Sequence, residues 1–536
     1  MKIVNHLIVL FVISLGVVSC DLMDNIDNIE PQNQQELENV MSDSASAQSL
    51  LRNVYQQWRA GSLREVRDHL SLSSGALFCP ELNMLTSGMA FQSNNVLHDD
   101  QVTVDVYTDL YKVVNMANIV KNLLEEGKAP DLSEVRTEEM IAECRFHRAM
   151  AHFYLLRYFG QFYDTSSKYG VVVWEKPYPD YLVAIARATV EDVYTSVLKD
   201  LDYAIEKAPE YLSGDRHYYI SRLTVKALKA KVLLCKGDYT NAESVAKSVL
   251  DDASRYGYDL ESTYEEVFVN SFNSKEVLFA VYAYGINENY SASSIVNNTT
   301  YGSYTETIAR LAFWAEWGYD YDMESGMGYD ERFAYTYRAD GPDVGGGIGG
   351  GENPVPEPEP EPEPWPDPLP EPDMLSADEG YMEPDGDSGD DWNPEAMRRN
   401  HKYPYVDMSS GAKGNTYFYL RLAEVYYIHA EAAVRNGHME PARESLKTVM
   451  NFERIYFYPE DIDEVSDTEM LEFVRKNKWL ELFAENNEEW FDLVRYHKAG
   501  NLNIADIKSS VTSDRQLIFP IPRTAMAGNN LLEQNP

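Results

Sequence analysis

Apolar positions along much of the chain recur at steps of three and four residues, which is the spacing of one face of an α-helix. The clearest case is "AECRFHRAMAHFYLLRYFG", which ends at Gly160, where a helix C-cap is expected. Its apolar face consists of Ala142, Phe146, Ala149, Phe153 and Leu156. Similar patterns over 107–124 and 192–204 predict further helices. The chain is therefore predicted to be mainly α-helical, with helices that pack on one another.

An internal repeat extends this prediction. Residues 222–250 align with a segment 200 positions further along the chain. Gly237 falls on Gly437, and Ala242 falls on Ala442. Both segments thus have a helix, a turn at glycine, and a second helix whose early small residue permits close packing. This is the pattern of tetratricopeptide repeats. We expect an α-helical repeat solenoid with irregular, loop-rich insertions.

The N-terminus has a different pattern. In "MKIVNHLIVLFVISLGVVSCD" a lysine precedes an apolar run over residues 7–18. A membrane-spanning helix needs about 20 such residues, so residues 1–19 are predicted to be a secretory signal peptide. The closing "VVSC" is similar to the lipobox of bacterial lipoproteins, which predicts lipidation of Cys20. A plain signal peptide with an accidental cysteine is the alternative. Residues 20–35 lack periodicity and are predicted to be a tether.

Residues 339–397 form an insert of distinct composition. They contain no Lys or Arg but 18 Asp and Glu, and proline alternates with glutamate in "PEPEPEPEP". Because proline lacks a backbone donor and the acids repel one another, the insert is predicted to be extended, without a core. The sequence "DGDSGDD" at 385–391 is interpreted as a solvated spacer. A structural Ca²⁺ site is the alternative, but the stretch lacks the residue spacing of an EF-hand loop. The folded regions are assigned to 36–338 and 398–536, as parts of one domain.

The overall charge excludes some partners. Lys and Arg total 46 against 87 Asp and Glu, which gives a formal net charge of -41. Nucleic acid and anionic membrane surfaces would repel such a chain. Membrane attachment is therefore expected to come from the N-terminal lipid.

Cysteine and histidine do not form a recognisable metal or disulfide pattern. Cys79, Cys144 and Cys235 are widely spaced and are predicted to be buried free thiols. His147 and His152 are five positions apart, which places them on different faces of a helix. We predict neither a metal site nor a cofactor.

Residues 479–500, "WLELFAENNEEWFDLVRYHKAG", are called the acidic segment below and are the strongest candidate for acid-base chemistry. Their acids are Glu481, Glu485, Glu488, Glu489 and Asp492. Glycosidases use paired carboxylates, but these acids fall on several faces of one helix or its turn. Structural pairing with Arg475 and Arg495 is predicted instead. The motifs H-E-x-x-H, G-x-S-x-G and the P-loop are absent from the sequence, and the protein is predicted not to be an enzyme.

Aromatic residues give a better indication of a binding site. Tyrosine outnumbers phenylalanine by 38 to 19, and its hydroxyl can stay solvated while the ring makes contacts. Residues 301–321 carry seven aromatic side chains with acids between them. Such rings stack on sugars or on peptide side chains, so this stretch is a predicted ligand platform. Its candidate residues are Trp314, Trp317, Tyr319 and Tyr321. The alternative is that the two tryptophans share a buried helix face.

Several blocks of the sequence, taken in order, resemble one known family. They are the lipobox, "AECRFHRAMAHFYLLRYFG", the Gly-Asp-Tyr repeat turn, "YLRLAEVYYIHAEAAVRNG", "EEWFDLVRYHKAG" and the terminal "FPIPRTAMAGNNLLEQNP". Their order is similar to that of the SusD/RagB-like outer-membrane lipoproteins, over nearly the whole chain. The resemblance implies that the Trp-Phe-Asp-Leu segment is structural and that the protein binds without catalysis.

The resemblance also implies a function and a location. Such proteins are lipid-anchored at the cell surface of Gram-negative bacteria and cap a TonB-dependent, SusC-like outer-membrane transporter. They capture oligosaccharide nutrients, and sometimes peptides, for uptake. Asp21, Asp24 and Asp27 fit the acidic flank that accompanies export to the outer leaflet. A surface repeat scaffold or adhesin is the alternative, and a neighbouring reading frame for a large TonB-dependent β-barrel would favour the transporter-coupled protein.

Two features depart from the family pattern. Residues 486–489, "NNEE", stand where the family commonly has a glycine and a basic residue before the tryptophan, and the Pro-Glu insert is not typical. Ligand-binding aromatics vary among members. The candidate residues at 301–321 therefore rest on composition alone.

Overall fold

The computed structural model describes residues 40–75, 86–179, 181, 183–210, 219–281, 332, 335, 337–339, 398–400, 402–403 and 415–536. The predicted signal peptide and tether, Cys79, residues 301–321 and residues 340–397 lie outside the described residues.

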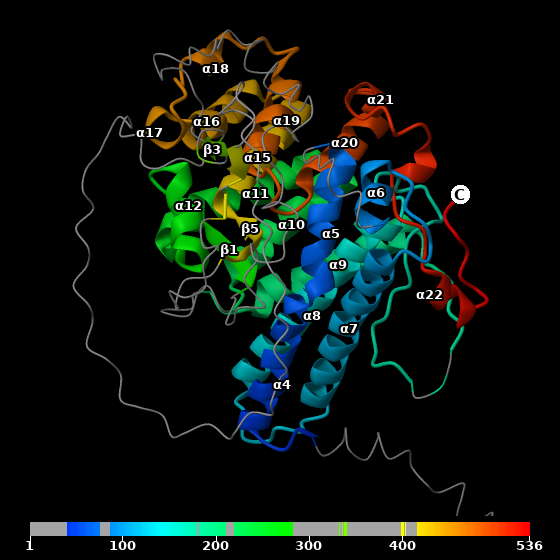
Figure 1. Ribbon diagram of the computed structural model, residues 1–536. Coiled ribbons are helices and arrows are strands. Elements are labelled where there is room, and N and C mark those ends of the chain that lie inside the picture. The colour runs from blue at the N-terminus through cyan, green and yellow to red at the C-terminus, as the bar shows by residue number, and fades with distance from the viewer. Residues whose placement is uncertain are drawn as a thin grey trace, which may run out of the picture.

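Helices dominate the described part of the chain (Figure 1). The N-terminal helices are α4 (Ser44–Gln56), α5 (Gly61–Ser74), α6 (Thr86–Gln92), α7 (Gln101–Glu125), α8 (Glu134–Phe159), α9 (Val190–Lys207), α10 (Arg222–Lys236), α11 (Tyr239–Ala253) and α12 (Tyr264–Asn270). The C-terminal helices are α15 (Leu422–Asn436), α16 (Met439–Val449), α17 (Phe452–Ile455), α18 (Asp461–Glu464), α19 (Met470–Glu481), α20 (Glu488–Lys498), α21 (Ile504–Ile507) and α22 (Arg523–Ala527). Short 3₁₀ turns are η1 (Gln57–Arg59), η3 (Ser254–Tyr256), η4 (Ser271–Asn273) and η11 (Asp514–Gln516).

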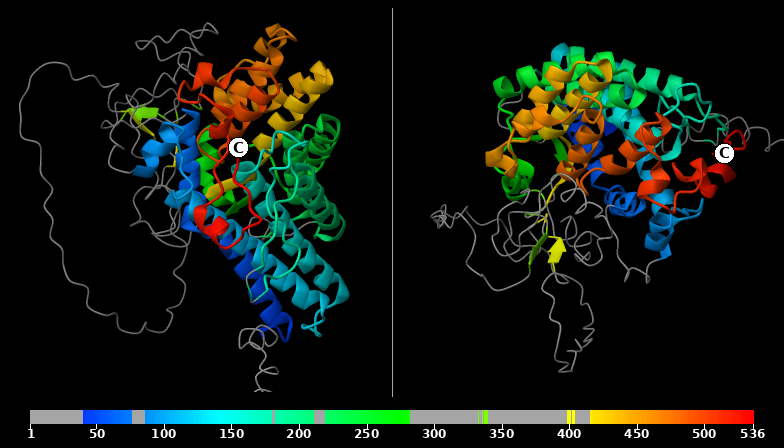
Figure 2. Two further views of the ribbon diagram at one scale, coloured as in Figure 1. Left: turned by 90° about the vertical axis from the view of Figure 1, so that its right-hand side faces the viewer. Right: turned by 90° about the horizontal axis from the view of Figure 1, so that it is seen from above.

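Successive helices pack on their neighbours. Helix α7 contacts α8, α8 contacts α9, α9 contacts α10, and α10 contacts α11. The run then continues from α11 to α15 and α16, across the long segment between them (Figures 1 and 2). The prediction of a mainly helical, repeat-type solenoid is confirmed.

The internal repeat corresponds to two helix hairpins that adjoin in space. Gly237 ends α10 with φ of 85°, and Gly437 ends α15 with φ of 81°. This left-handed conformation favours glycine, which is why each hairpin turns there. Ala242 and Ala442 are completely buried in the second helix of each pair.

Helix α8 is buried on all sides rather than on one face. Its five predicted apolar positions are fully buried, but so are polar residues such as His147, Arg148 and Arg157. Gly160 ends the helix as predicted, although its φ of -117° is not left-handed. A Cβ atom there would lie 2.7 Å from Leu156 Cδ1 and 3.1 Å from the carbonyl oxygens of Leu156 and Tyr169, so a larger residue would crowd its neighbours.

Two antiparallel strand pairs join segments that are distant in sequence. Strand β1 (Val277–Val281) pairs with β5 (Tyr417–Arg421), and β3 (Tyr337–Ala339) pairs with β4 (Arg398–Asn400). In the first pair Val277 lies opposite Arg421, which brings Glu276 close to the start of α15. The main hydrophobic core includes residues from α5 through to the C-terminal segment.

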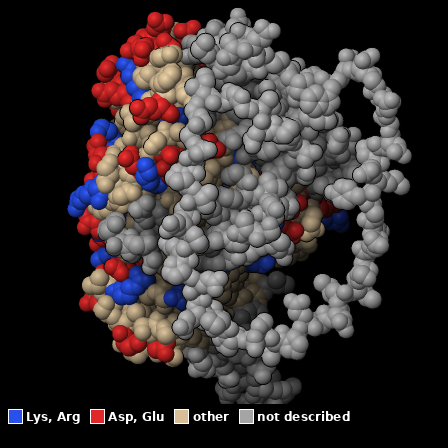
Figure 3. All heavy atoms as spheres, turned by 60° about the vertical axis from the view of Figure 1, so that its left-hand side comes forward, with Lys and Arg blue, Asp and Glu red and all other residues tan. Residues whose placement is uncertain are grey.

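The described surface carries many acids. Figure 3 shows Asp and Glu side chains gathered at the upper end of the molecule, the end at which Figure 1 places α17 and α18. This agrees with the negative net charge of -41.

Candidate functional site

The five acids of the acidic segment lie on two helices and the turn between them. Glu481 ends α19, Glu485 lies in the turn, and the other three lie on α20. All five side chains are buried. The acids thus lie on two helices and a turn rather than on one helix, and their burial leaves them without direct access to a substrate.

The turn between α19 and α20 is fixed by two asparagines. Asn487 adopts φ of 60°, a left-handed conformation that asparagine tolerates better than most residues. The Asn486 side chain accepts a hydrogen bond from Tyr154 Oη at 2.8 Å and donates one to the Tyr419 carbonyl at 2.8 Å. The turn is therefore held inside the core by α8 and β5.

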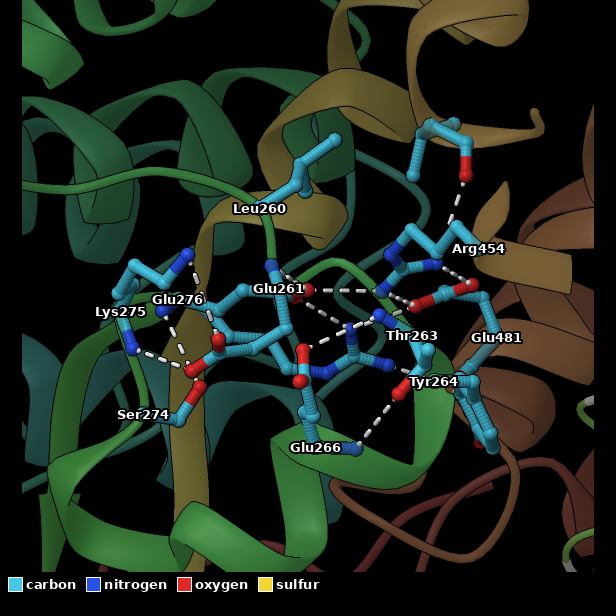
Figure 4. Close-up of polar contacts among 12 residues, drawn as sticks. Leu260, Glu261, Thr263, Tyr264, Glu266, Ser274, Lys275, Glu276, Arg454 and Glu481 are labelled. Atoms are coloured by element: carbon cyan, nitrogen blue, oxygen red, sulfur yellow. Dashed lines mark hydrogen bonds and ion pairs between the residues drawn. The ribbon is translucent and has the colours of Figure 1, made fainter. Parts of the chain in front are cut away.

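Arginines from two other elements hold the first two acids. Arg454 of α17 lies between Glu276 and Glu481, with N–O distances of 2.8 and 2.7 Å (Figure 4). Arg421 at the end of β5 contacts the same two carboxylates at 2.9 and 2.6 Å, and contacts Glu485 at 2.7 Å. These carboxylates are thus shared between two cations.

A second set of cations holds the acids of α20. Glu488 contacts Arg157 of α8 and Lys231 of α10, each at 2.7 Å. Lys231 also contacts Glu424 of α15 at 2.8 Å. One carboxylate in α20 therefore joins the acidic segment to α8 and α10, and Lys231 extends the link to α15.

Of the two arginines predicted to pair with the acidic segment, the structure confirms one. Arg495 contacts Asp492 at 2.6 Å, as predicted. Arg475 does not reach the acidic segment's carboxylates and instead contacts Glu472 at 2.5 Å. Residues three apart on a helix are surface neighbours, so Arg475 meets the nearer acid on its own helix. Asp492 takes Lys478 as its other partner, at 2.9 Å.

Ion pairing fixes the protonation of the paired acids. Burial by itself raises the pKa of Glu481, but Arg454 and Arg421 outweigh it and hold that pKa well below its usual range. Burial is likewise outweighed at Glu488, where Arg157 and Lys231 lower the pKa. These carboxylates stay ionised near neutral pH and cannot donate a proton as a general acid must.

Glu489 is the exception within the segment. Burial raises its pKa to about 7, and a hydrogen bond from Ser71 Oγ to Oε1 at 2.7 Å offsets this only in part. Its other carboxyl oxygen has no hydrogen-bond partner among the described residues. A raised pKa is typical of a general acid, but Glu489 faces α5 and is 2% exposed.

One cavity of about 170 Å³ lies beside the acidic segment. Trp490 and Phe519 form part of its wall, together with Asn94 and Gln516. The Gln516 amide is already used, since it donates to the carbonyls of Asn94 and Ser510 at 3.0 and 2.9 Å. The cavity is smaller than the roughly 300–1,000 Å³ typical of small-molecule sites, so it is a weak candidate for a ligand pocket.

A cluster of exposed rings is the stronger candidate in the described residues. Phe452, Tyr456 and Tyr458, called the aromatic triad below, are 45%, 50% and 51% exposed. The Phe452 ring lies 5.6 Å from that of Tyr456 and 4.9 Å from that of Tyr458, between centroids. This cluster is not among the sites predicted from the sequence. The available signal was "FERIYFYP", in which aromatic residues crowd a short stretch that ends at proline.

The residues predicted as a ligand platform are not placed by the structure. Trp314, Trp317, Tyr319 and Tyr321 lie outside the described residues, as does the lipidation site Cys20. They remain predictions.

The histidines and cysteines singled out in the sequence, where the structure describes them, are buried in the core. His147 Nδ1 accepts a hydrogen bond from Trp58 Nε1 at 3.0 Å, and His152 Nε2 accepts one from the Trp174 backbone at 3.2 Å. Burial lowers the pKa of each histidine to about 3, so both are neutral. Cys144 and Cys235 are buried free thiols, as predicted.

The described residues contain no group of three or more His, Cys, Asp or Glu side chains that could hold a metal ion. Among the helices placed by the structure, none is long and apolar enough to cross a membrane.

The fold and these sites define a helical-repeat protein whose acid-rich C-terminal segment is structural. The chain belongs to the SusD family. Residues 22–234 match the family described as "Starch-binding associating with outer membrane", and residues 275–536 match the family described as "SusD family". The resemblance stated above is confirmed.

Curated relatives support the family over part of the chain. A SusD-like protein of Bacteroides ovatus is 27% identical over 233 residues, which is 42% of this chain and 40% of the relative. SusD-like protein P2 of Formosa agariphila is 27% identical over 207 residues, which is 37% of each chain. The chain thus spans about two fifths of the length of the curated relatives that it matches.

Solved structures share the fold over most of the chain. A SusD superfamily protein from Bacteroides thetaiotaomicron superposes with a TM-score of 0.66 and 19% identity, covering 92% of this chain and 100% of its own. A laminarin binding SusD-like protein superposes with a TM-score of 0.63 and 18% identity, covering 92% of this chain and 99% of its own. A protein from Bacteroides vulgatus whose name describes it as sugar binding superposes with a TM-score of 0.63 and 18% identity, covering 93% of this chain and 99% of its own. At these identities the likeness shows the fold.

Proposed function

We propose that this protein is a cell-surface lipoprotein that captures oligosaccharide nutrients and delivers them to a TonB-dependent, SusC-like outer-membrane transporter. The observation that carries this proposal is the match of two SusD-family descriptions to residues 22–234 and 275–536. The names of two similar structures, one laminarin binding and one sugar binding, support a glycan as the ligand class.

The chemistry of the acidic segment supports binding without catalysis. Retaining and inverting glycosidases need one carboxylic acid that gives up a proton and a second carboxylate beside the scissile bond. Here Glu481 and Glu488 are buried and held ionised by arginine and lysine. Glu489 has the pKa of a proton donor but lies buried against Ser71.

Glycan capture is tested with polysaccharides in affinity gels, followed by calorimetry. Soluble starch and laminarin are included because the family description and a similar structure name them. We expect Trp314→Ala and Trp317→Ala to weaken binding about thirtyfold, as aromatic anchors typically do. Tyr181→Ala is the matched control, because Tyr181 is an exposed tyrosine that lies outside residues 301–321 in the sequence. Binding of peptides but not of any polysaccharide would favour a peptide-binding member of the family, and binding of neither would favour a scaffold or adhesin.

The membrane anchor is tested separately. Cys20→Ala is expected to move the protein from the outer-membrane fraction to the soluble fraction, because lipidation of Cys20 is the proposed attachment. Cys235→Ala removes a buried thiol and serves as the control. If the Cys20→Ala protein still sediments with the outer membrane in cells that lack the transporter, the lipoprotein assignment is wrong.

A further inference from the structure

The aromatic triad is built on a rigid base. Between its rings, Arg454, Ile455 and Phe457 point inward and are buried. Arg454 is the cation that contacts Glu276 and Glu481 in the core, and its backbone N–H is capped by the Asn451 side chain at 3.0 Å. The rings are therefore held outward by a backbone that is fixed from beneath.

The position of Tyr456 is unusual for a bulky residue. It ends α17 with φ of 56° and ψ of 31°, in the left-handed region where glycine is favoured. Its backbone N–H still donates to the Phe452 carbonyl at 3.0 Å. Such strain persists only where the surroundings over-determine it, and it concentrates at binding sites. Here it turns a half-exposed ring toward that of Phe452.

The charges around the triad select the kind of ligand. Glu453, Glu460, Asp463 and Glu464 are exposed acids within the same stretch, and Figure 3 shows acids gathered at this end of the molecule. The cations close by in sequence are engaged: Arg454 is buried in the core network, and Lys447 and Arg443 contact Asp463 and Asp467 at 2.6 and 3.0 Å. A polyanion would be repelled, whereas a neutral ligand would not.

The size of the triad also restricts the ligand. Three half-exposed rings present roughly 300 Å², since an aromatic side chain buries about 150–250 Å² when fully covered. A stable protein interface needs about 800 Å² on each partner. The triad matches one or two sugar rings better than a protein surface, and tyrosine hydroxyls at its edge can bond to sugar hydroxyls while the rings stack on C–H faces.

We propose that Phe452, Tyr456 and Tyr458 form a stacking surface for a neutral sugar chain, made of residues other than those of the predicted platform at 301–321. This inference rests on the proposed glycan-binding function and adds to it a second contact and a ligand class, an uncharged polysaccharide.

The test compares a triad variant with wild type in affinity gels. The variant carries Phe452→Ala, Tyr456→Asn and Tyr458→Ala; asparagine is chosen at position 456 because it tolerates the left-handed backbone. The gels contain soluble starch, mixed-linkage β-glucan, galactomannan or xylan as neutral polymers, and polygalacturonate as an anionic one. Tyr181→Ala is the matched control, and Tyr458→Phe keeps the ring while removing the hydroxyl. Circular dichroism confirms that each variant is folded.

We expect the neutral polymer that retards wild type most to bind the triad variant about tenfold more weakly, with Tyr181→Ala and Tyr458→Phe close to wild type. Equal retardation of the triad variant and wild type would overturn the stacking surface and leave the proposed function standing. Retardation of wild type by polygalacturonate alone would overturn the neutral ligand class. Retardation by no polymer would overturn the proposed function and the stacking surface together. A triad variant that keeps full polysaccharide affinity but no longer co-purifies with the transporter would assign the triad to that protein contact instead.

Discussion

Residues 451–464 and the acidic segment 479–500 are both rich in aromatic and acidic side chains, yet the first presents three of its four aromatic rings to solvent and the second lies largely in the interior. Each stretch has five acids. In the acidic segment all five are buried, and four of them meet lysines or arginines, some from distant elements such as β5, α8 and α10. In residues 451–464 most acids face solvent, and Asp463 contacts a lysine from neighbouring α16.

This difference shows what decides the role of such a stretch. A buried carboxylate is tolerated only when cations and donors replace its hydration, so a segment becomes part of the core where those partners converge. Arg454 belongs to both regions. Its guanidinium joins the buried network, while the residues on either side of it in α17 and beyond carry the exposed rings.

Breaking the buried ion pairs of the acidic segment is expected to have the largest effect on the free energy of unfolding. Arg421→Met leaves Glu276, Glu481 and Glu485 without one of their cations, and removing one partner of a buried ion pair costs about 3–5 kcal/mol. Lys247→Met, which breaks the exposed pair with Asp251, is the control and should cost less than about 1 kcal/mol. Urea unfolding measures both. Equal stability of the two variants would show that the acidic segment is not held by its ion pairs.

Substitution of one phenylalanine in each region tests how tightly the two regions are packed. Phe491 in α20 is 1% exposed and Phe452 in α17 is 45% exposed. Phe491→Ala should lower the free energy of unfolding by about 3–5 kcal/mol, because it leaves a cavity in the core. Phe452→Ala should lower it by less than about 1 kcal/mol. A large loss at Phe452 would mean that the triad belongs to the core.

The contribution of Glu489 to the stability of the acidic segment is expected to depend on pH. Its folded pKa of about 7 lies above the value of about 4.3 in an unfolded chain, so its contribution to stability is complete below pH 4.3 and is lost as pH rises through 7. Glu489→Gln stays uncharged, and we expect its free energy of unfolding to exceed that of wild type at pH 8 by up to about 4 kcal/mol, while the two are similar near pH 4.5. Parallel pH profiles for wild type and Glu489→Gln would contradict the raised pKa.

The fold was predictable because its signals are local. Apolar spacing defined α8, and the glycines at 237 and 437 marked both hairpin turns. The sequence did not show that α8 is buried on all sides, because Arg157 finds its partner Glu488 at a separation of 331 residues. A single sequence carries no record of such pairs. Arg475 was assigned to the wrong acid for a different reason, because its partner Glu472 lies three positions earlier on the same helix, outside the acidic segment.

The sequence predicted the type of site, an aromatic binding surface, but not the residues of the aromatic triad. Aromatic crowding indicated a binding protein, and the acids were correctly interpreted as structural. The aromatic triad was missed because α17 spans only Phe452–Ile455, too short for periodicity to separate inward from outward positions. Side-chain direction there depends on the left-handed backbone at Tyr456, which composition does not indicate.

The claim that the chain binds a glycan and does not convert it is tested most directly by one calorimetric titration with recovery of the ligand. Purified protein is titrated with the polysaccharide that it binds best, incubated for a day, and the polymer is then sized by chromatography. The buried, ion-paired acids predict saturable binding and a polymer of unchanged length. Shorter products that form with wild type and disappear with Glu489→Gln would contradict it, and would assign catalysis to the one acid of the segment whose pKa is raised to about 7.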